Sequence, residues 1–245
     1  MFPYTLKVIL VLGDLHIGLV EDSSKTEKLN IILDRFKDAE MLIMLGDIFD
    51  FYFECEDVVM NKYRDIINLL EKTAKKIPVF YIQGNHDFFP LKILQERGIK
   101  VIKKDLLLFR KGKSFYFTHG DLLSLEGLTT RIFLTFKLWQ VLMKLLPCNF
   151  IYSIAAAISK WSRKRSSQKS IKESFKKAQK RLLKKYDCVI TAHLHKPLIE
   201  RTPENKIYLN PGDWLTFYTF ATLEDNQITL WEIKDEINKK EVVKL

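Results

Sequence analysis

Five short apolar runs in this chain each end in a polar motif, and glycine stands beside the polar residue in most of them. The runs cover residues 7–12, 41–45, 79–83, 115–118 and 188–192, and the motifs are Gly13-Asp14, Gly46-Asp47, Gly84-Asn85, His119-Gly120 and His193. Runs of five or six strand-forming residues, apolar on both faces, indicate buried strands. Residues 25–37 and 57–76, between the early runs, have helix-like patterns. This alternation predicts an α/β fold with a largely parallel sheet and ligands beyond the carboxyl ends of its strands.

Residues 122–185 have a different character. No strand-like run occurs there, and residues 132–146 are apolar nearly all round. Residues 160–185 then hold twelve Lys and Arg against one acid, a charge of +11, whereas the remaining 28 basic and 29 acidic residues leave the rest of the chain near −1. We interpret residues 1–121 and 186–245 as one core domain, and 122–185 as a helical insertion that forms a lid over the substrate. The basic block must face an anionic partner or solvent.

Within the basic block, Ile171, Phe175, Ala178 and Leu182 recur at helical spacing and predict an amphipathic cationic helix. After it, residues 207–209, 216–223 and 228–233 are predicted strands of a second, mainly antiparallel sheet.

The 245-residue length allows a core that needs no disulfide or structural metal. The three cysteines, Cys55, Cys148 and Cys188, lack CxxC spacing, which argues against a disulfide framework or a thiolate zinc site. The N-terminal apolar stretch is too short for a signal peptide, and the longest uncharged stretch, residues 145–159, is shorter than the ~20 residues that span a bilayer. We therefore expect a cytoplasmic protein.

All five histidines belong to the strand-end motifs. Four of them and three other residues offer seven potential metal ligands: Asp14, His16, Asp47, Asn85, His119, His193 and His195. Seven are too many for one four-coordinate zinc ion, but they suit two ions that share a carboxylate. Asp47 stands alone in its motif and is the predicted bridge. We expect one ion on Asp14, His16, Asp47 and His195, and the other on Asp47, Asn85, His119 and His193.

Mixed carboxylate, amide and imidazole ligands suit Mn²⁺, our first choice, or Fe²⁺, and Zn²⁺ is possible. Two such ions close together favour in-line displacement at phosphorus by an activated water. The predicted chemistry is hydrolysis of a phosphoester or pyrophosphate without a protein nucleophile.

The motifs Asp14-Leu-His16, Gly46-Asp47, Gly84-Asn-His-Asp87, His119-Gly-Asp121 and His193-Leu-His195 resemble those of the calcineurin-like metallophosphoesterase superfamily, in the same order. The resemblance covers about residues 14–195. It implies a four-layer α/β/β/α sandwich with a dinuclear metal centre between the layers. It also implies that His86 stabilises or protonates the leaving group, and that Asp87 holds His86. The usual Gly-His-Thr/Ser-His motif is Ala-His-Leu-His here, which keeps the ligands and changes their surroundings.

Within the superfamily, the chain resembles the UDP-2,3-diacylglucosamine hydrolases, the pyrophosphatases of lipid A synthesis. Residues 45–53, the basic helical insertion and Asn210-Pro-Gly-Asp-Trp214 carry this likeness. It implies a nucleotide-sugar lipid substrate, UMP and 2,3-diacylglucosamine 1-phosphate as products, and peripheral association with the anionic inner face of the cytoplasmic membrane. The expected substrate-binding residues are Asn85, His86, Arg163, Arg165, Lys169 and His193. Some family members have arginine where His86 stands.

Two other functions stay open. A nuclease or a cyclic-nucleotide phosphodiesterase could use the same centre, with the basic block on nucleic acid; the mostly aliphatic insertion disfavours this, because single-strand binders use aromatic platforms. A scaffold without turnover could keep the fold and lose ligands, whereas all seven ligands are present here. The sequence does not define the oligomeric state.

Overall fold

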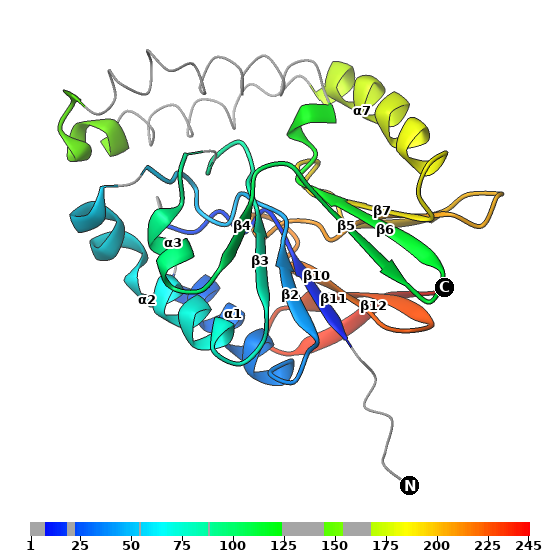
Figure 1. Cartoon of the computed structure of the whole chain (residues 1–245), viewed down its shortest axis with the longest axis horizontal. Coiled ribbons are helices and arrows are strands. Elements are labelled where there is room, and N and C mark those ends of the chain that lie inside the picture. The colour runs from blue at the N-terminus through cyan, green and yellow to red at the C-terminus, as the bar shows by residue number, and fades with distance from the viewer. Residues whose placement is uncertain (1–7, 19–22, 54, 88, 124–144, 154–167) are drawn as a thin grey trace, which may run out of the picture.

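The computed structural model describes residues 8–18, 23–53, 55–87, 89–123, 145–153 and 168–245 (Figure 1). The larger sheet has seven strands in the order β12 (Ile237–Lys244), β11 (Gln227–Ile233), β10 (Thr219–Leu223), β1 (Ile9–Leu12), β2 (Met41–Met44), β3 (Val79–Ile82) and β4 (Lys100–Ile102). The smaller sheet has five, in the order β5 (Asp105–Arg110), β6 (Lys113–Thr118), β7 (Cys188–Thr191), β9 (Ile207–Asn210) and β8 (Leu198–Arg201). Strands β1 to β4 are parallel to one another, as are β6, β7 and β9.

Helices cover the outer faces of the two sheets (Figure 1). Helices α1 (Ser23–Arg35), α2 (Glu56–Ala74) and α3 (Lys92–Glu96) lie on the larger sheet, and α7 (Gln168–Leu183) lies on the smaller one. A 3-10 helix, Asp121–Leu123, follows β6. The four-layer α/β/β/α sandwich that the motifs implied is therefore confirmed.

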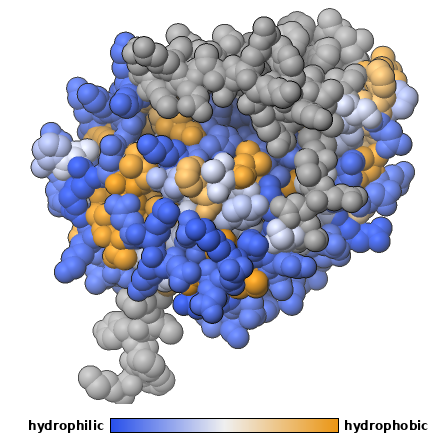
Figure 2. Space-filling view, turned by 180° about the vertical axis from the view of Figure 1, so that it is seen from behind, coloured by the Kyte–Doolittle hydropathy of each residue, from blue (hydrophilic) through white to orange (hydrophobic). Residues whose placement is uncertain are grey.

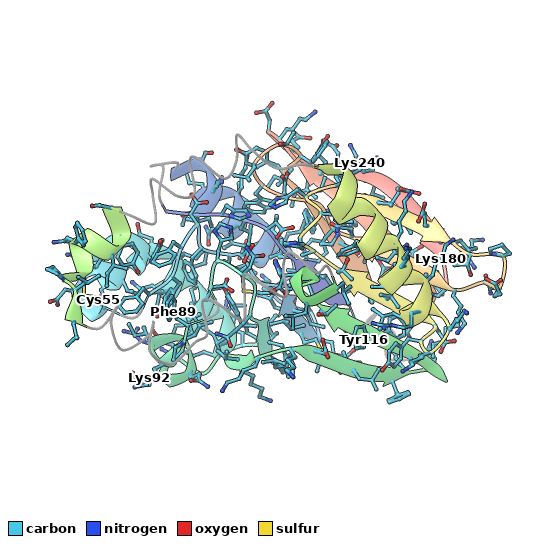
Figure 3. The ribbon with its side chains drawn as sticks, turned by 90° about the horizontal axis from the view of Figure 1, so that it is seen from above. Cys55, Phe89, Lys92, Tyr116, Lys180 and Lys240 are labelled. Atoms are coloured by element: carbon cyan, nitrogen blue, oxygen red, sulfur yellow. A yellow bond between two sulfur atoms is a disulfide. The ribbon has the colours of Figure 1, made fainter. Side chains whose placement is uncertain are left out.

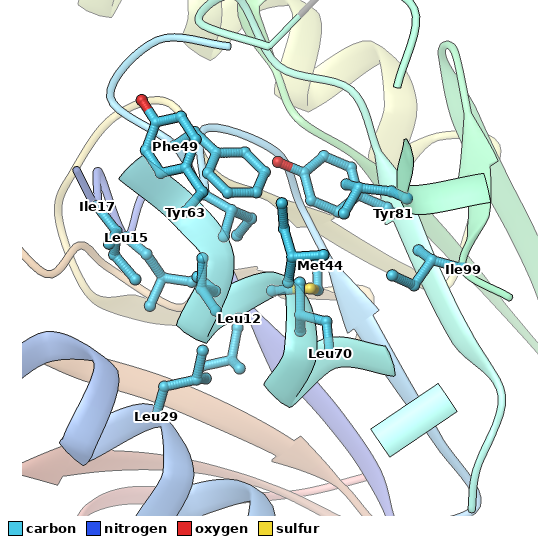
Figure 4. Close-up of a cluster of buried hydrophobic side chains, with 14 of the residues drawn as sticks. Leu12, Leu15, Ile17, Leu29, Met44, Phe49, Tyr63, Leu70, Tyr81 and Ile99 are labelled. Carbon is cyan, nitrogen blue, oxygen red and sulfur yellow. The ribbon is translucent and has the colours of Figure 1, made fainter. Parts of the chain in front are cut away.

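The hydrophobic core follows these layers because strands that are apolar on both faces bury both. In β1, Leu10 and Leu12 face the helices, whereas Ile9 and Val11 pack between the sheets. Figure 4 shows part of the helix-side core, in which Phe49, Tyr63 and Tyr81 pack above leucines of β1 and α2. Seen from behind, the described surface is mainly hydrophilic with separate hydrophobic patches (Figure 2).

The prediction that the three C-terminal runs share a second antiparallel sheet is wrong. Strand β9 lies in the smaller sheet, parallel to β7, whereas β10 and β11 extend the larger sheet beyond β1. All three runs are apolar on both faces, so their patterns do not distinguish between two sheets that are both buried. The edge strands β5 and β12 were not predicted. Strand β12 is largely charged and exposed, whereas β5 alternates exposed residues with partly buried ones and is not apolar on two buried faces.

The predicted amphipathic cationic helix is α7, whose Phe175 and Ala178 are buried against the smaller sheet. Among the described residues, no helix is long and apolar enough to cross a membrane. Residues 124–144 and 154–167 lie outside the described part of the chain, and Arg163 and Arg165 are among them. The limits and lid function of the insertion stay predictions.

One described segment of the insertion, residues 145–153, packs on the core beside the loop that follows β2. Ile151 and Tyr152 are buried, and the Tyr152 hydroxyl donates to the Phe53 carbonyl oxygen at 2.8 Å and accepts from the Phe53 amide at 3.2 Å. This packing places Cys148 next to Cys55, 93 residues away, and the two form a disulfide. The sequence argument against disulfides is therefore wrong for these two cysteines, whereas Cys188 is free and buried. Sequence spacing could not reveal a contact made only by the folded insertion.

We expect Cys148→Ala to lower the free energy of unfolding by about 2–4 kcal/mol, because the disulfide restricts the unfolded chain. Urea unfolding of the wild type and the variant without reductant measures the difference. With reductant, the two proteins should unfold alike. Alkylation of all three cysteines in the native, non-reduced protein would contradict the assignment.

Candidate metal centre

The five motifs meet at one end of the two sheets, in the loops that leave β1, β2, β3, β6 and β7. Five of the residues in these loops have a left-handed backbone that side chains rarely adopt: Asp14 (φ 51°), His16 (47°), Asp47 (52°), His193 (68°) and His195 (54°). Such conformations cost free energy and gather at functional sites. All five are predicted metal ligands.

Glycine lets the β2 and β3 loops approach backbone to backbone. Gly46 has φ of +84°, and a Cβ there would lie 2.5 Å from the Gly84 nitrogen. A Cβ on Gly84 would lie 2.1 Å from Oδ1 of Asp47. A larger residue at position 84 would displace the Asp47 carboxylate, and one at position 46 would push the β3 loop away.

Backbone amides fix the two central carboxylates. Oδ2 of Asp14 accepts from the His193 amide at 2.8 Å, and Oδ1 of Asp47 accepts from the His86 amide at 2.8 Å. Both carboxylates are buried, and each is tied to a loop that leaves a different strand. The second oxygen of each carboxylate is left to face the neighbouring histidines.

Three groups of possible ligands overlap in this cluster, and in each the ligand atoms lie within 4.8 Å of one another: Asp14, His16 and His195; Asp14, Asp47 and His119; and His16, Asp47 and His86. Asp14, His16 and Asp47 each belong to two groups, so the cluster is continuous. Among the described residues, Oδ1 of Asp14 and Nε2 of His16 are buried without a hydrogen-bond partner. Buried acceptors without donors, arranged in adjoining triplets, fit divalent cations.

The remaining predicted ligands adjoin the second side of Asp47. Nε2 of His119 lies 3.4 Å from Oδ2 of Asp47 and 3.0 Å from Oδ1 of Asn85. Nδ1 of His119 donates to the Leu45 carbonyl at 2.6 Å, which directs Nε2 into the site. The His193 ring lies 5.2 Å from that of His119. The structure thus brings all seven predicted ligands together; the assignment of each to a particular ion stays a prediction.

Two carboxylates that were not predicted as functional orient the outer histidines. Nδ1 of His16 lies 3.3 Å from Oδ1 of Asp50, and Nδ1 of His195 lies 3.2 Å from Oδ2 of Asp213. Carboxylates commonly fix metal-binding histidines in this way. Both stand in segments that the sequence singled out, residues 45–53 and 210–214.

The turn at residues 210–214 brings Asp213 into place. Oδ1 of Asp213 accepts from the amides of Thr216 and Phe217 at 3.0 and 3.1 Å, and the Trp214 amide donates to the Asp14 carbonyl oxygen at 3.0 Å. The turn, which precedes β10, is therefore hydrogen-bonded to the loop that follows β1.

Asp87 does not hold His86, contrary to the expectation from sequence. Its buried carboxylate accepts from the Tyr81 hydroxyl at 2.5 Å and from the Gly84 amide at 2.6 Å, so it stabilises the turn between them. Burial raises the pKa of Asp87 to about 6. Nδ1 of His86 instead contacts the Asp50 carbonyl oxygen at 2.5 Å, and its Nε2 lies 4.0 Å from Oδ2 of Asp47.

The electrostatics of the metal-free cluster favour bound protons. Burial alone would lower the pKa of His119, but the Asp47 carboxylate raises it to about 10. Burial opposes protonation of His195 too, yet Asp14 and Asp213 raise its pKa to about 9. Burial lowers the pKa of His16, and lowers that of His193 to about 3. Two rings therefore carry protons where cations would bind.

This fold and cluster define a metal-dependent phosphoesterase. The sequence profile of the calcineurin-like phosphoesterases matches residues 7–197, and the chain belongs to that family. It is a hydrolase of phosphoester or pyrophosphate bonds that uses divalent metal ions.

Among its relatives, the UDP-2,3-diacylglucosamine hydrolase of Shewanella pealeana is 25% identical over 232 residues, covering 91% of this chain and 97% of the relative. The enzyme of that name from Vibrio vulnificus is 26% identical over 219 residues, covering 84% and 89%. Two solved structures share the fold. The E. coli phosphoesterase Yfce has a TM-score of 0.52 at 15% identity, covering 96% of this chain and 98% of that one. Vacuolar protein sorting 29 of Cryptosporidium parvum has a TM-score of 0.50 at 17% identity, covering 98% of each.

Divalent metal binding should release protons. At pH 7 the raised pKa values keep His119 and His195 protonated in the metal-free protein, and both must lose a proton to bind a cation. We expect release of about two protons per chain and an apparent Mn²⁺ affinity that rises from pH 6 to pH 8. Calorimetric titration in buffers of different ionisation enthalpy measures this. An affinity independent of pH over that range would contradict it.

Asp213→Asn should weaken Mn²⁺ binding about 10–100-fold. The amide oxygen still accepts from the Thr216 and Phe217 amides, whereas the negative charge beside His195 is lost. Equilibrium dialysis measures the affinity. Asp225→Asn, at a surface ion pair with Lys111, is the matched control and should bind as the wild type does. Equal affinities for both variants would remove Asp213 from this role.

Proposed function

We propose that this chain hydrolyses the pyrophosphate bond of UDP-2,3-diacylglucosamine, giving UMP and 2,3-diacylglucosamine 1-phosphate. The observation that carries the reaction type is the set of three ligand groups that overlap at Asp14, His16 and Asp47. The substrate rests on similarity to hydrolases of that name over nearly the full length of both chains. Since it covers 91% of this chain, this similarity extends beyond residues 7–197, which the family profile covers.

Two divalent ions, which we propose to be Mn²⁺ with Fe²⁺ or Zn²⁺ as alternatives, would polarise the phosphate and lower the pKa of water. Asp14, His16, Asp47 and His195 would hold one ion, and Asp47, Asn85, His119 and His193 the other. The amide-bound carboxylates keep these ligands in place before substrate arrives. Preorganised charge of this kind is a large contributor to catalysis.

His86 is suited to act on the leaving phosphate. Its ring is partly exposed, its Nδ1 is fixed on the Asp50 carbonyl, and its Nε2 points toward the Asp47 side of the cluster. In its protonated form, Nε2 can donate to a phosphate oxygen as the anhydride bond breaks. Asn85 would contact the same phosphate group through its side-chain amide.

The lipid part of the substrate fits residues 145–150 of the insertion. Leu145, Leu146 and Phe150 are 76%, 38% and 52% exposed, respectively, beside the aromatic segment at residues 51–53. Exposed apolar side chains on a segment that packs against residues 51–55, the loop that continues from Asp50, suit acyl chains. Arg163 and Arg165 lie outside the described residues and the side chain of Lys169 is not described; these three stay proposed contacts of the nucleotide phosphates. A peripheral position on the cytoplasmic face of the membrane belongs to this proposal.

The test is product analysis with the Mn²⁺-loaded protein and detergent-dispersed UDP-2,3-diacylglucosamine. Mass spectrometry should find UMP and the lipid phosphate. Asp47→Asn keeps the side chain's shape and should lower the rate about 10²–10³-fold, because the predicted bridging charge is lost. Asp225→Asn is the control and should keep the wild-type rate.

Each adverse outcome has a distinct meaning. Hydrolysis of single-stranded DNA or cyclic nucleotides without UMP release from the lipid would reject the proposed substrate and keep the metal centre. Metal binding without hydrolysis of any phosphodiester would indicate a scaffold and overturn the proposal altogether.

A further inference from the structure

The outer side of α7 carries a continuous stripe of positive charge. Three pairs of cations repeat at four-residue intervals: Lys176 and Lys177 and then Lys180 and Arg181 on α7, and Lys184 and Lys185 in the turn directly after it. Residues four apart lie on the same side of a helix. All six side chains are exposed, and within the described part of the chain none of them forms an ion pair.

The packing of α7 directs this stripe outward. Phe175 and Leu183 are buried against the smaller sheet together with Val189 and Tyr208. Past the end of α7, the Tyr186 ring stacks on Tyr116 of β6 at 4.7 Å. Figure 3 shows Lys180 on α7 and Tyr116 on β6 on the same side of the molecule.

Two apolar side chains of the edge strand β5 continue this surface. Phe109 is 76% exposed and Leu107 is 41% exposed. Leu107 lies opposite Tyr116, and Phe109 lies opposite Ser114, so both project on the face that α7 covers. The Ser114 hydroxyl donates a hydrogen bond to the Asp187 carboxylate and accepts one from the Asp187 amide. Asp187 follows Lys185 and Tyr186 in the chain. The apolar pair therefore adjoins the last turn of the cationic stripe.

Asp187 does not neutralise the stripe. Its Oδ2 accepts from the amide and the hydroxyl of Ser114 at 2.9 and 2.7 Å, which engages the carboxylate on the sheet. The exposed Glu200 accepts a hydrogen bond from Gln179, between the cation pairs, at 3.3 Å. One such acid leaves the stripe strongly positive.

We propose that this surface, the six cations of the α7 stripe with Leu107 and Phe109, docks the protein on an anionic lipid leaflet. The inference rests on the proposed lipid substrate. It combines cations at the end of the predicted insertion with Leu107 and Phe109 of β5, which belongs to the smaller sheet of the core. Cations beside exposed apolar side chains are typical of proteins that lie at a membrane interface, where the charges meet headgroups and the apolar groups enter the acyl boundary.

Two other partners fit this surface less well. A second copy of the chain would bring six like charges against six. Nucleic acid would use the charges and could stack on Phe109, but the neighbouring Leu107 offers no stacking surface. An acyl environment accommodates both side chains.

The experiment is cosedimentation of the full-length, Mn²⁺-loaded protein with vesicles. The wild type should bind vesicles that contain phosphatidylglycerol at least tenfold better than pure phosphatidylcholine vesicles, and the binding should fall as salt rises. Lys180→Glu with Lys184→Glu should lower binding at least tenfold, and Leu107→Ser with Phe109→Ser should lower it several-fold. Lys239→Glu with Lys240→Glu, on the larger sheet's edge strand β12, is the matched control and should bind as the wild type does.

The rate of hydrolysis of a water-soluble phosphodiester is measured for each protein as a control, because this reaction does not require membrane binding. All four proteins should hydrolyse it at equal rates, which shows that the variants are folded. Wild-type protein that releases UMP from dispersed lipid but ignores anionic vesicles would overturn the docking surface alone. Equal vesicle binding by all variants would also overturn it. The wild type could instead bind single-stranded DNA and not vesicles, and Lys180→Glu with Lys184→Glu could abolish that DNA binding. This result would assign the surface to nucleic acid and overturn the lipid proposal.

Discussion

The site depends on two buried carboxylates, Asp14 and Asp47, whose charges the protein only partly balances. Each carboxylate accepts one backbone amide from another motif, so its position is set by the fold. Its second oxygen faces histidines, and its burial makes an uncompensated charge costly. Without a metal ion, the negative charge of these carboxylates raises the pKa values of His119 and His195, so both rings hold a proton at neutral pH. Divalent cations would take the place of these protons, and the overlapping ligand groups are shaped for them.

The fold supports this centre by joining two sheets at one end. Asp14, Asp47 and Asn85 follow strands of the larger sheet, whereas His119 and the last two histidines follow strands of the smaller one. The left-handed backbone at five of these residues is held by hydrogen bonds between loops, such as that from the Asp14 amide to the Gly46 carbonyl. The site is thus a property of sheet-on-sheet packing, and the apolar faces of β1, β2, β6 and β7 stabilise it indirectly.

The sequence was sufficient to predict the buried strands β1, β2, β3, β6, β7, β9, β10 and β11 and the helices α1, α2 and α7. It also predicted that the seven candidate ligands meet, because they follow buried runs. It could not assign β9 and β10 to different sheets, since both are apolar on both faces. The Cys55–Cys148 disulfide was missed because it depends on a tertiary contact between residues far apart in sequence. Asp50, Asp213 and Asp87 belong to recognised segments, but which side chain each carboxylate contacts is a matter of loop geometry.

The most direct test of this account is the number of divalent ions that the centre holds. After equilibration with saturating Mn²⁺ and removal of free metal, elemental analysis should find two ions per chain, and anomalous scattering should place them on either side of Asp47. Asp47→Asn should reduce this number while the protein remains folded. One ion or none in the wild type, or ions bound away from Asp14 and Asp47, would contradict the central claim.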